Sequence, residues 1–134
     1  MADDEVWTVE DHLRGAAPEH VALYRRVEGL LLGMADVRTR VSRTTVTFAG
    51  TRRGFAGARP TTRGVRGYLD LTRRLPDDPR VTSVTPYTAR LFVHQYLLRS
   101  AEDLDDTFVG WLREAHAVGQ GAHLAPRTER PPAG

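Results

Sequence analysis

The sequence predicts a two-layer α+β fold, in which a mostly antiparallel sheet of five or six strands carries N-terminal and C-terminal amphipathic helices on one face. Apolar residues recur with a helical period at both ends of the chain, and with a period of two between residues 37 and 99. No helical pattern separates the central strands, which argues against parallel crossovers. A length of 134 residues fits one domain. We place it at 7–120 and expect disordered tails at 1–6 and 121–134.

Two helices are expected before the sheet. Thr8 can cap the first, with Asp11 three residues on, and the helix ends near Gly15. The second begins at Pro18, because proline suits the first helical turn, and Gly33 is its expected end. Its apolar stripe consists of Leu23, Val27, Leu30, Leu31 and Met34.

Short alternating segments joined by glycine-rich turns predict an antiparallel meander in the middle of the chain. The segment 75–79 is expected to be a loop, since two prolines flank a pair of aspartates. The expected strands lie at residues 37–41, 46–48, 55–59, 65–71, 81–86 and 90–98.

One further helix is expected after the sheet. Ser100 can cap it, and the acidic residues that follow favour the positive end of the helix dipole. Phe108 and Trp111 lie on its apolar stripe, which predicts that both pack in the core, and Gly119 is the expected end.

Composition excludes several kinds of chemistry. Cysteine is absent and all 19 basic residues are arginine. A disulfide, a thiolate zinc site, a cysteine nucleophile and any lysine-based catalysis are therefore excluded. No apolar run approaches the length of a membrane span, and the acidic start of the chain is unlike a secretory signal, so we expect a cytoplasmic protein with no membrane partner.

Charge is strongly segregated along the chain. Residues 1–36 carry three arginines and eight acidic residues, a net charge of −5. Residues 37–99 carry thirteen arginines and three acidic residues, a net charge of +10, and residues 100–134 have a net charge of −3. In a two-layer fold this distribution predicts a positive sheet and a negative helical layer.

Strand parity indicates where the charged side chains point. Arg38, Arg40 and Arg66 alternate with apolar neighbours and should face away from the helices. In strand 90–98 we assign the parity of Leu91 and Leu97 to the core, although Phe92 and Leu98 can equally claim the interior. The residues of the opposite parity, which include Arg90, His94 and Tyr96, would then lie on the sheet face away from the helices. The candidate ligand-binding residues are Arg38, Arg40, Arg66, Tyr68, Arg90, His94 and Tyr96.

Arginine mixed with aromatic rings is the chemistry that holds phosphates and stacks bases. The favoured hypothesis is a binding domain for an anionic partner, such as a nucleotide, a nucleic acid or an acidic protein surface. Arginines can also simply be solvated or pair with the protein's own acids. Two other functions stay open. One is a small enzyme or ligand sensor, with an accessible His94 and Tyr96 at a pocket between the sheet and the loop 73–80, and the other is a homodimer joined through the sheet. No residue pattern indicates a catalytic group, a metal site or a cofactor.

Several short motifs carry a family resemblance. They are the run 8–12, the strand 55–60, the segment 73–75, Arg90-x-x-x-His94, Ser100-x-x-Asp103 and Trp111-Leu112-x-x-Ala115. With these motifs, over roughly residues 7–120, the chain resembles domain-of-unknown-function family 5655. It is also more distantly similar to the YdhG-type and frataxin-like α+β group, which implies one sheet with helices on one side. Neither resemblance implies an activity, a cofactor or a catalytic residue for this chain.

Overall fold

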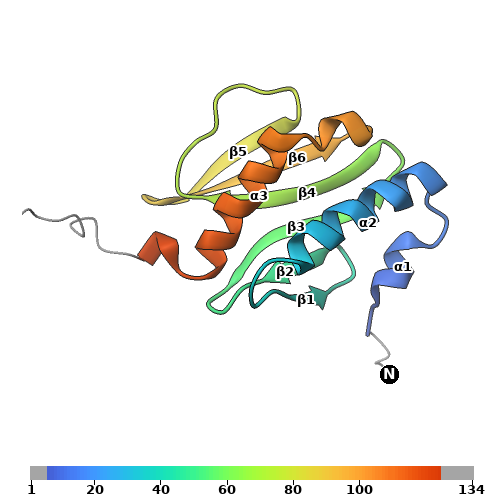
Figure 1. The fold of residues 1–134 in the computed structure, drawn as a ribbon, viewed down its shortest axis with the longest axis horizontal. Helices are drawn as coiled ribbons and strands as arrows, with labels where there is room; N and C mark the ends of the chain where they lie inside the picture. Colours follow the sequence, from blue (N-terminus) through green and yellow to red (C-terminus); the bar gives the residue numbers. More distant parts are fainter. Residues whose placement is uncertain (1–5, 125–134) are drawn as a thin grey trace, which may run out of the picture.

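The computed structural model describes residues 6–124 and has the predicted two-layer architecture (Figure 1). Six strands form one antiparallel sheet in the order β1-β2-β3-β4-β6-β5, and the helices lie across one of its faces. The strands are β1 Arg38–Val41, β2 Val46–Ala49, β3 Gly54–Thr61, β4 Gly64–Leu71, β5 Val81–Thr88 and β6 Leu91–Leu98. The helices are α1 Val9–Leu13, α2 Pro18–Leu32 and α3 Asp106–Gly119, with 3-10 turns η1 Ala101–Asp103 and η2 Ala122–Leu124.

The first two helices begin where the sequence predicts. Thr8 and Asp11 form a reciprocal cap, in which the Thr8 side chain accepts from the Asp11 amide and the Asp11 carboxylate accepts from the Thr8 amide. Helix α2 starts at Pro18 and ends at Leu32, with Gly33 as its C-cap. It buries Leu23, Val27 and Leu31 as expected, together with Tyr24, Val46, Phe48 and Leu69 in the same core cluster.

The start of α3 differs from the prediction. Ser100 makes no capping bond to the backbone, because its hydroxyl donates to Glu102. The segment after it forms the turn η1, and the helix begins six residues later with Asp105 as its cap, accepting from the Phe108 amide at 2.9 Å. The acidic residues predicted to lie in one helix start are therefore divided between two elements. Glu102 and Asp103 lie in η1, whereas Asp105 and Asp106 lie at the start of α3.

Two boundaries also differ slightly. Strand β3 continues through Pro60 to Thr61, which pairs with Gly64 at the start of β4. Residues 121–124, assigned to a tail, include the turn η2. The other predicted tail residues, 1–5 and 125–134, lie outside the described residues.

A glycine on the helix side of the sheet lets two strands and a ring pack closely. A Cβ at Gly67 would collide with the Gly57 carbonyl and with the Tyr96 hydroxyl. That hydroxyl donates to the Gly57 carbonyl at 2.8 Å, and the Tyr96 ring meets Phe108 of α3 edge-on. Because Gly67 has no side chain, the Tyr96 ring can lie against the centre of the sheet and pack there against Phe108 of the helical layer.

Candidate anion-binding face

The sheet face opposite the helices is called here the open face. Directly paired residues of neighbouring strands share a face. The register places Arg40, Thr47, Gly57, Tyr68 and Gln95 in one row across five strands. Their strand neighbours on the other parity, such as Val46, Ala58 and Leu69, belong to the core cluster under the helices. Within residues 6–124, no helix lies over this row (Figure 1).

Two arginines lie directly opposite each other on the open face. Arg59 of β3 pairs with Arg66 of β4 in the antiparallel register. Cβ atoms of such a pair are about 5 Å apart, and like charges in this position repel. No carboxylate among residues 6–124 lies within ion-pairing distance of either one. The pair is therefore a concentration of positive charge that the described chain does not neutralise.

A second group of side chains meets above Gly54. The position of a Cβ at Gly54 is 3.1 Å from a terminal guanidinium nitrogen of Arg40, 2.9 Å from the Thr47 methyl and 3.7 Å from the Tyr68 hydroxyl. The guanidinium of Arg40 thus reaches from the edge strand β1 across β2 towards the tyrosine. Because glycine leaves this space empty, the arginine head and the phenol lie near one another.

The ring of Tyr68 packs closely against the backbone of β3 at Gly57. A Cβ at Gly57 would clash with the near edge of this ring, 2.5 Å from one of its carbons. Partial burial raises the pKa of the Tyr68 phenol above its usual value, while a hydrogen bond with Thr47 acts in the opposite direction. The phenol stays protonated at neutral pH and presents a half-buried aromatic surface beside the arginines.

Asp70 is the one acidic residue in the six described strands, and it is buried on the open face. Its carboxylate accepts from Arg53 at 2.7 Å, and its other oxygen has no partner among the described residues. The side chain is 3% exposed. Burial raises the pKa of Asp70 to about 6, and the guanidinium of Arg53 limits the rise. The one carboxylate that the described strands place on this face is thus already held by an arginine.

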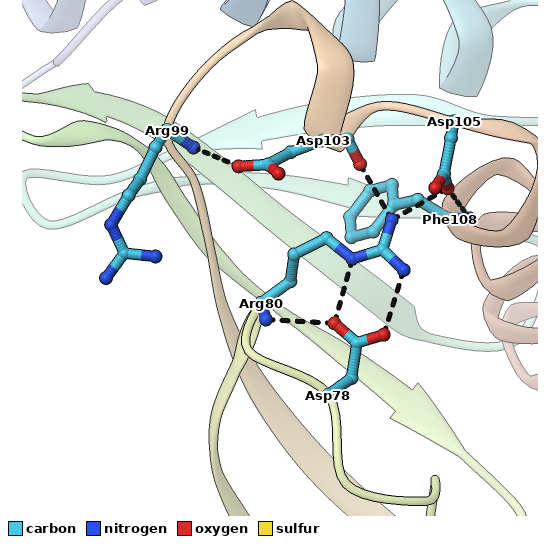
Figure 2. A network of polar contacts seen from close by, with 6 residues as sticks. All are labelled: Asp78, Arg80, Arg99, Asp103, Asp105 and Phe108. Carbon is cyan, nitrogen blue, oxygen red and sulfur yellow. Dashed lines mark hydrogen bonds and ion pairs between the residues drawn. The ribbon is translucent and has the colours of Figure 1, made fainter.

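Other arginines of residues 37–99 form ion pairs that stabilise the fold. Arg73 forms a bidentate pair with Glu114 of α3. Arg80, shown in Figure 2, binds both oxygens of Asp78, the backbone carbonyl of Asp103 and the carboxylate of Asp105. These pairs tie the loop between β4 and β5 to the start and the middle of α3.

The thirteen arginines of residues 37–99 are thus divided by position. Those named here the open-face arginines are Arg38, Arg40, Arg59 and Arg66. Hairpin turns carry Arg43, Arg52, Arg53, Arg63 and Arg90, the loop after β4 carries Arg73, Arg74 and Arg80, and Arg99 follows β6. The predicted facing of Arg38, Arg40 and Arg66 is confirmed, whereas clustering of the whole set on one face is not.

The predicted parity of β6 is wrong. His94 pairs with Leu69 and Tyr96 with Gly67, so both face the helices, and both are fully or almost fully buried. Among the described residues, His94 forms hydrogen bonds with backbone groups only. The Leu75 amide donates to Nε2 at 3.1 Å, and Nδ1 lies 3.2 Å from the Phe92 carbonyl. The expectation of an accessible His94 is therefore also wrong.

Among the candidate residues, the structure brings Arg40 close to Tyr68 and places Arg38 and Arg66 on the same face. Arg90 lies in the turn between β5 and β6, and not within a strand of the sheet. Sequence reasoning missed Arg59, Thr47 and the Arg53–Asp70 pair. Arg59 lay within a predicted strand, so the parity rule applied to Arg66 was sufficient to find it.

Residues 6–124 contain no group of three or more histidine, aspartate or glutamate side chains able to hold a metal ion. None of the helices in the same residues is long and apolar enough to cross a membrane.

These features define a class: a small two-layer α+β domain with one arginine-bearing sheet face over which no helix lies within the described residues. The chain matches the family model described as "Domain of unknown function (DUF5655)" over residues 9–119, and it belongs to that family. No curated protein and no solved structure matches the chain. The more distant likeness to YdhG-type and frataxin-like proteins is not confirmed.

Proposed function

We propose that this protein is a binding module whose open face holds an extended anionic partner, with single-stranded nucleic acid as the best fit. The observation that carries the proposal is the Arg59–Arg66 pair, which has no carboxylate partner among residues 6–124. Two like charges placed opposite each other cost stability in a sheet. A bound anion removes that cost, which is a physical reason for the arrangement.

The spread of charge favours a long anion over a single phosphate. The Arg40 guanidinium lies above Gly54 of β3, and Arg59 starts five residues further along the same strand, a distance of about 16 Å. The Tyr68 ring lies between them on the face. Single-stranded nucleic acids are bound in this way on other sheets, where basic groups follow the phosphates and an aromatic ring stacks on a base.

The acidic helical layer gives the two sides of the module opposite charge. The segments that supply the helices carry net negative charge, whereas residues 37–99 carry a net charge of +10. A polyanion is repelled from the helical side and attracted to the open face. This polarity supports binding through one face in the cytoplasm, and it limits the wrapping of a long polyanion around the molecule.

We expect Arg66→Glu to weaken binding of fluorescein-labelled oligo-dT about tenfold, measured by fluorescence anisotropy at low salt. The reversed charge removes one phosphate contact and repels the neighbouring phosphate. The slope of log affinity against log salt should therefore also become shallower by about 1. The fold should survive, because Arg66 is partly exposed and the core residues of its strand are unchanged.

Arg113→Glu on α3 is the matched control, since it makes the same change in net charge on an exposed residue of the opposite layer. It should weaken binding less than twofold. Equal losses in the two variants would show that only net charge matters and would contradict a site on the open face. Binding of an acidic peptide but not oligo-dT would point to a protein surface as the partner.

A further inference from the structure

A groove runs beside the outer strand of the sheet, away from the open-face arginines. It is a cavity of about 580 Å³ between the loop residues 74–79 and the first half of β5. Strand β5 contributes the residues from Val81 to Val84 to its lining. The groove therefore combines a hollow with a strand at the edge of the sheet.

The two edges of the sheet are built differently. Strand β1 has four residues, two of them exposed arginines, which is a common protection against pairing with another strand. Strand β5 has eight residues, none of them charged, and most are exposed. Its register with β6 is irregular near Val81 and after Pro86, and it is regular from Ser83 to Pro86. This short regular stretch is long enough to pair with a few residues of another chain.

The wall of the groove is held in place before any partner arrives. Arg80 at the end of the loop is clamped by Asp78 and by the start of α3 (Figure 2). Its guanidinium also lies 4.8 Å from the ring centre of Trp111. At the other end, the Leu75 amide donates to the buried His94. A preformed wall lowers the entropy lost on binding.

The lining offers one cationic group and an apolar floor. Arg74 lies over the ring of Phe92, 5.4 Å from its centre, and no carboxylate among residues 6–124 is within ion-pairing distance of it. Leu75, Val81 and Val84 supply apolar surface. Asp78 is engaged by Arg80, whereas Asp77 lies on the rim and would disfavour an acidic residue there.

We propose that this groove binds the C-terminal end of a partner protein as an extended strand added to β5. The backbone of the peptide pairs with the regular stretch from Ser83, an apolar side chain packs on Val81 and Val84, and the terminal carboxylate pairs with Arg74. Strand addition supplies affinity through main-chain hydrogen bonds and specificity through such pockets. A chain end fits better than an internal segment, because the regular edge is short and irregular on both sides.

Two pools of random short peptides test the proposal, one with free C-terminal carboxylates and one with C-terminal amides. Each is passed over the immobilised full chain, and the bound fractions are compared. We expect at least fivefold greater recovery from the carboxylate pool, as a charge-assisted contact contributes about a factor of ten. This ratio should fall to about 1 in Arg74→Gln. That exposed substitution leaves the fold intact.

Arg63→Gln, in the hairpin between β3 and β4, is the matched control and should keep the ratio of the unchanged protein. Peptide recovered from the pool should also shift the amide resonances of residues 83–85 in NMR spectra. Equal recovery from both pools would overturn the proposal. So would a ratio that survives Arg74→Gln, or resonance shifts confined to the open face.

Discussion

Replacing Arg80 by alanine is expected to lower the free energy of unfolding by about 3 kcal/mol, measured by urea denaturation. The side chain is 12% exposed and joins two carboxylates, a backbone carbonyl and the Trp111 ring. Removing one member of a largely buried charged network leaves its partners unpaired, at a cost of roughly 3–5 kcal/mol for full burial. The expected value lies at the lower end of that range because Asp105 is half-exposed.

The loss should be concentrated in the loop after β4. Amide hydrogen exchange should accelerate in residues 74–80, and the near-ultraviolet spectrum of Trp111 should change. Arg99→Ala is the control. Its guanidinium points away from the network in Figure 2, and only its backbone amide bonds Asp103, at 2.7 Å. A loss below about 1 kcal/mol for Arg80→Ala, or equal losses for both variants, would contradict the role of the clamp.

Replacing Asp70 by asparagine is expected to raise the free energy of unfolding at pH 7 by about 2–3 kcal/mol. Burial raises the pKa of Asp70 from 3.8 to about 6, so its ionised form is unfavourable in the folded protein. A shift of about two units corresponds to roughly 3 kcal/mol. Asparagine resembles the neutral acid, and Arg53 keeps its contacts with the Gly54 carbonyl and the Tyr87 ring.

The pH dependence gives a sharper test. Between about pH 4 and about pH 6 the folded protein binds a proton at Asp70 that the unfolded chain has released. This group therefore lowers stability as pH rises through the window. Asp11, Asp78 and Asp105 act in the opposite direction at lower pH, because hydrogen bonds lower the pKa of each.

Asp70→Asn should therefore match the unchanged protein near pH 4 and exceed it at pH 7, in denaturation curves recorded across this range. Asp77→Asn, in the exposed loop, should change stability by less than about 0.5 kcal/mol at either pH. A destabilised Asp70→Asn at pH 7 would mean that the Arg53 pair outweighs the cost of burying the carboxylate.

Helices and strands follow local patterns closely in this chain, which is why the fold class could be predicted. Thr8, Pro18 and the stripe through Val27 carry their signals within a few residues of sequence. The start of α3 could not be placed as well. Ser100 and Asp105 are both good caps, and only the three-dimensional turn between them decides which one is used.

The parity of β6 shows where a local pattern becomes ambiguous. This strand lies inside the sheet and is buried on both faces, with Leu91 and Leu97 as inaccessible as Tyr96 and Leu98. Hydrophobicity alone therefore does not distinguish its two sides. The choice comes from long-range partners: the Gly57 carbonyl accepts from Tyr96, and the Leu75 amide satisfies His94. Both polar groups can then be buried without loss of hydrogen bonds.

The charge pattern predicted the open face in part. Alternation placed Arg38, Arg40 and Arg66 correctly, because each alternates with a less exposed neighbour: Thr39 and Val41 in β1 are half-buried, and Val65 before Arg66 in β4 is buried. Ion pairing depends on tertiary contacts, so the sequence could not separate these arginines from Arg73 and Arg80, which bind carboxylates.

Binding of the anion at the open face is measured most directly by NMR titration with oligo-dT. The proposal predicts the largest salt-sensitive shifts at the amides of Arg66, Tyr68 and Gln95, with little change along α2 and α3. Shifts confined to the helices, or no shift at low salt with saturating oligonucleotide and with an acidic peptide, would contradict it.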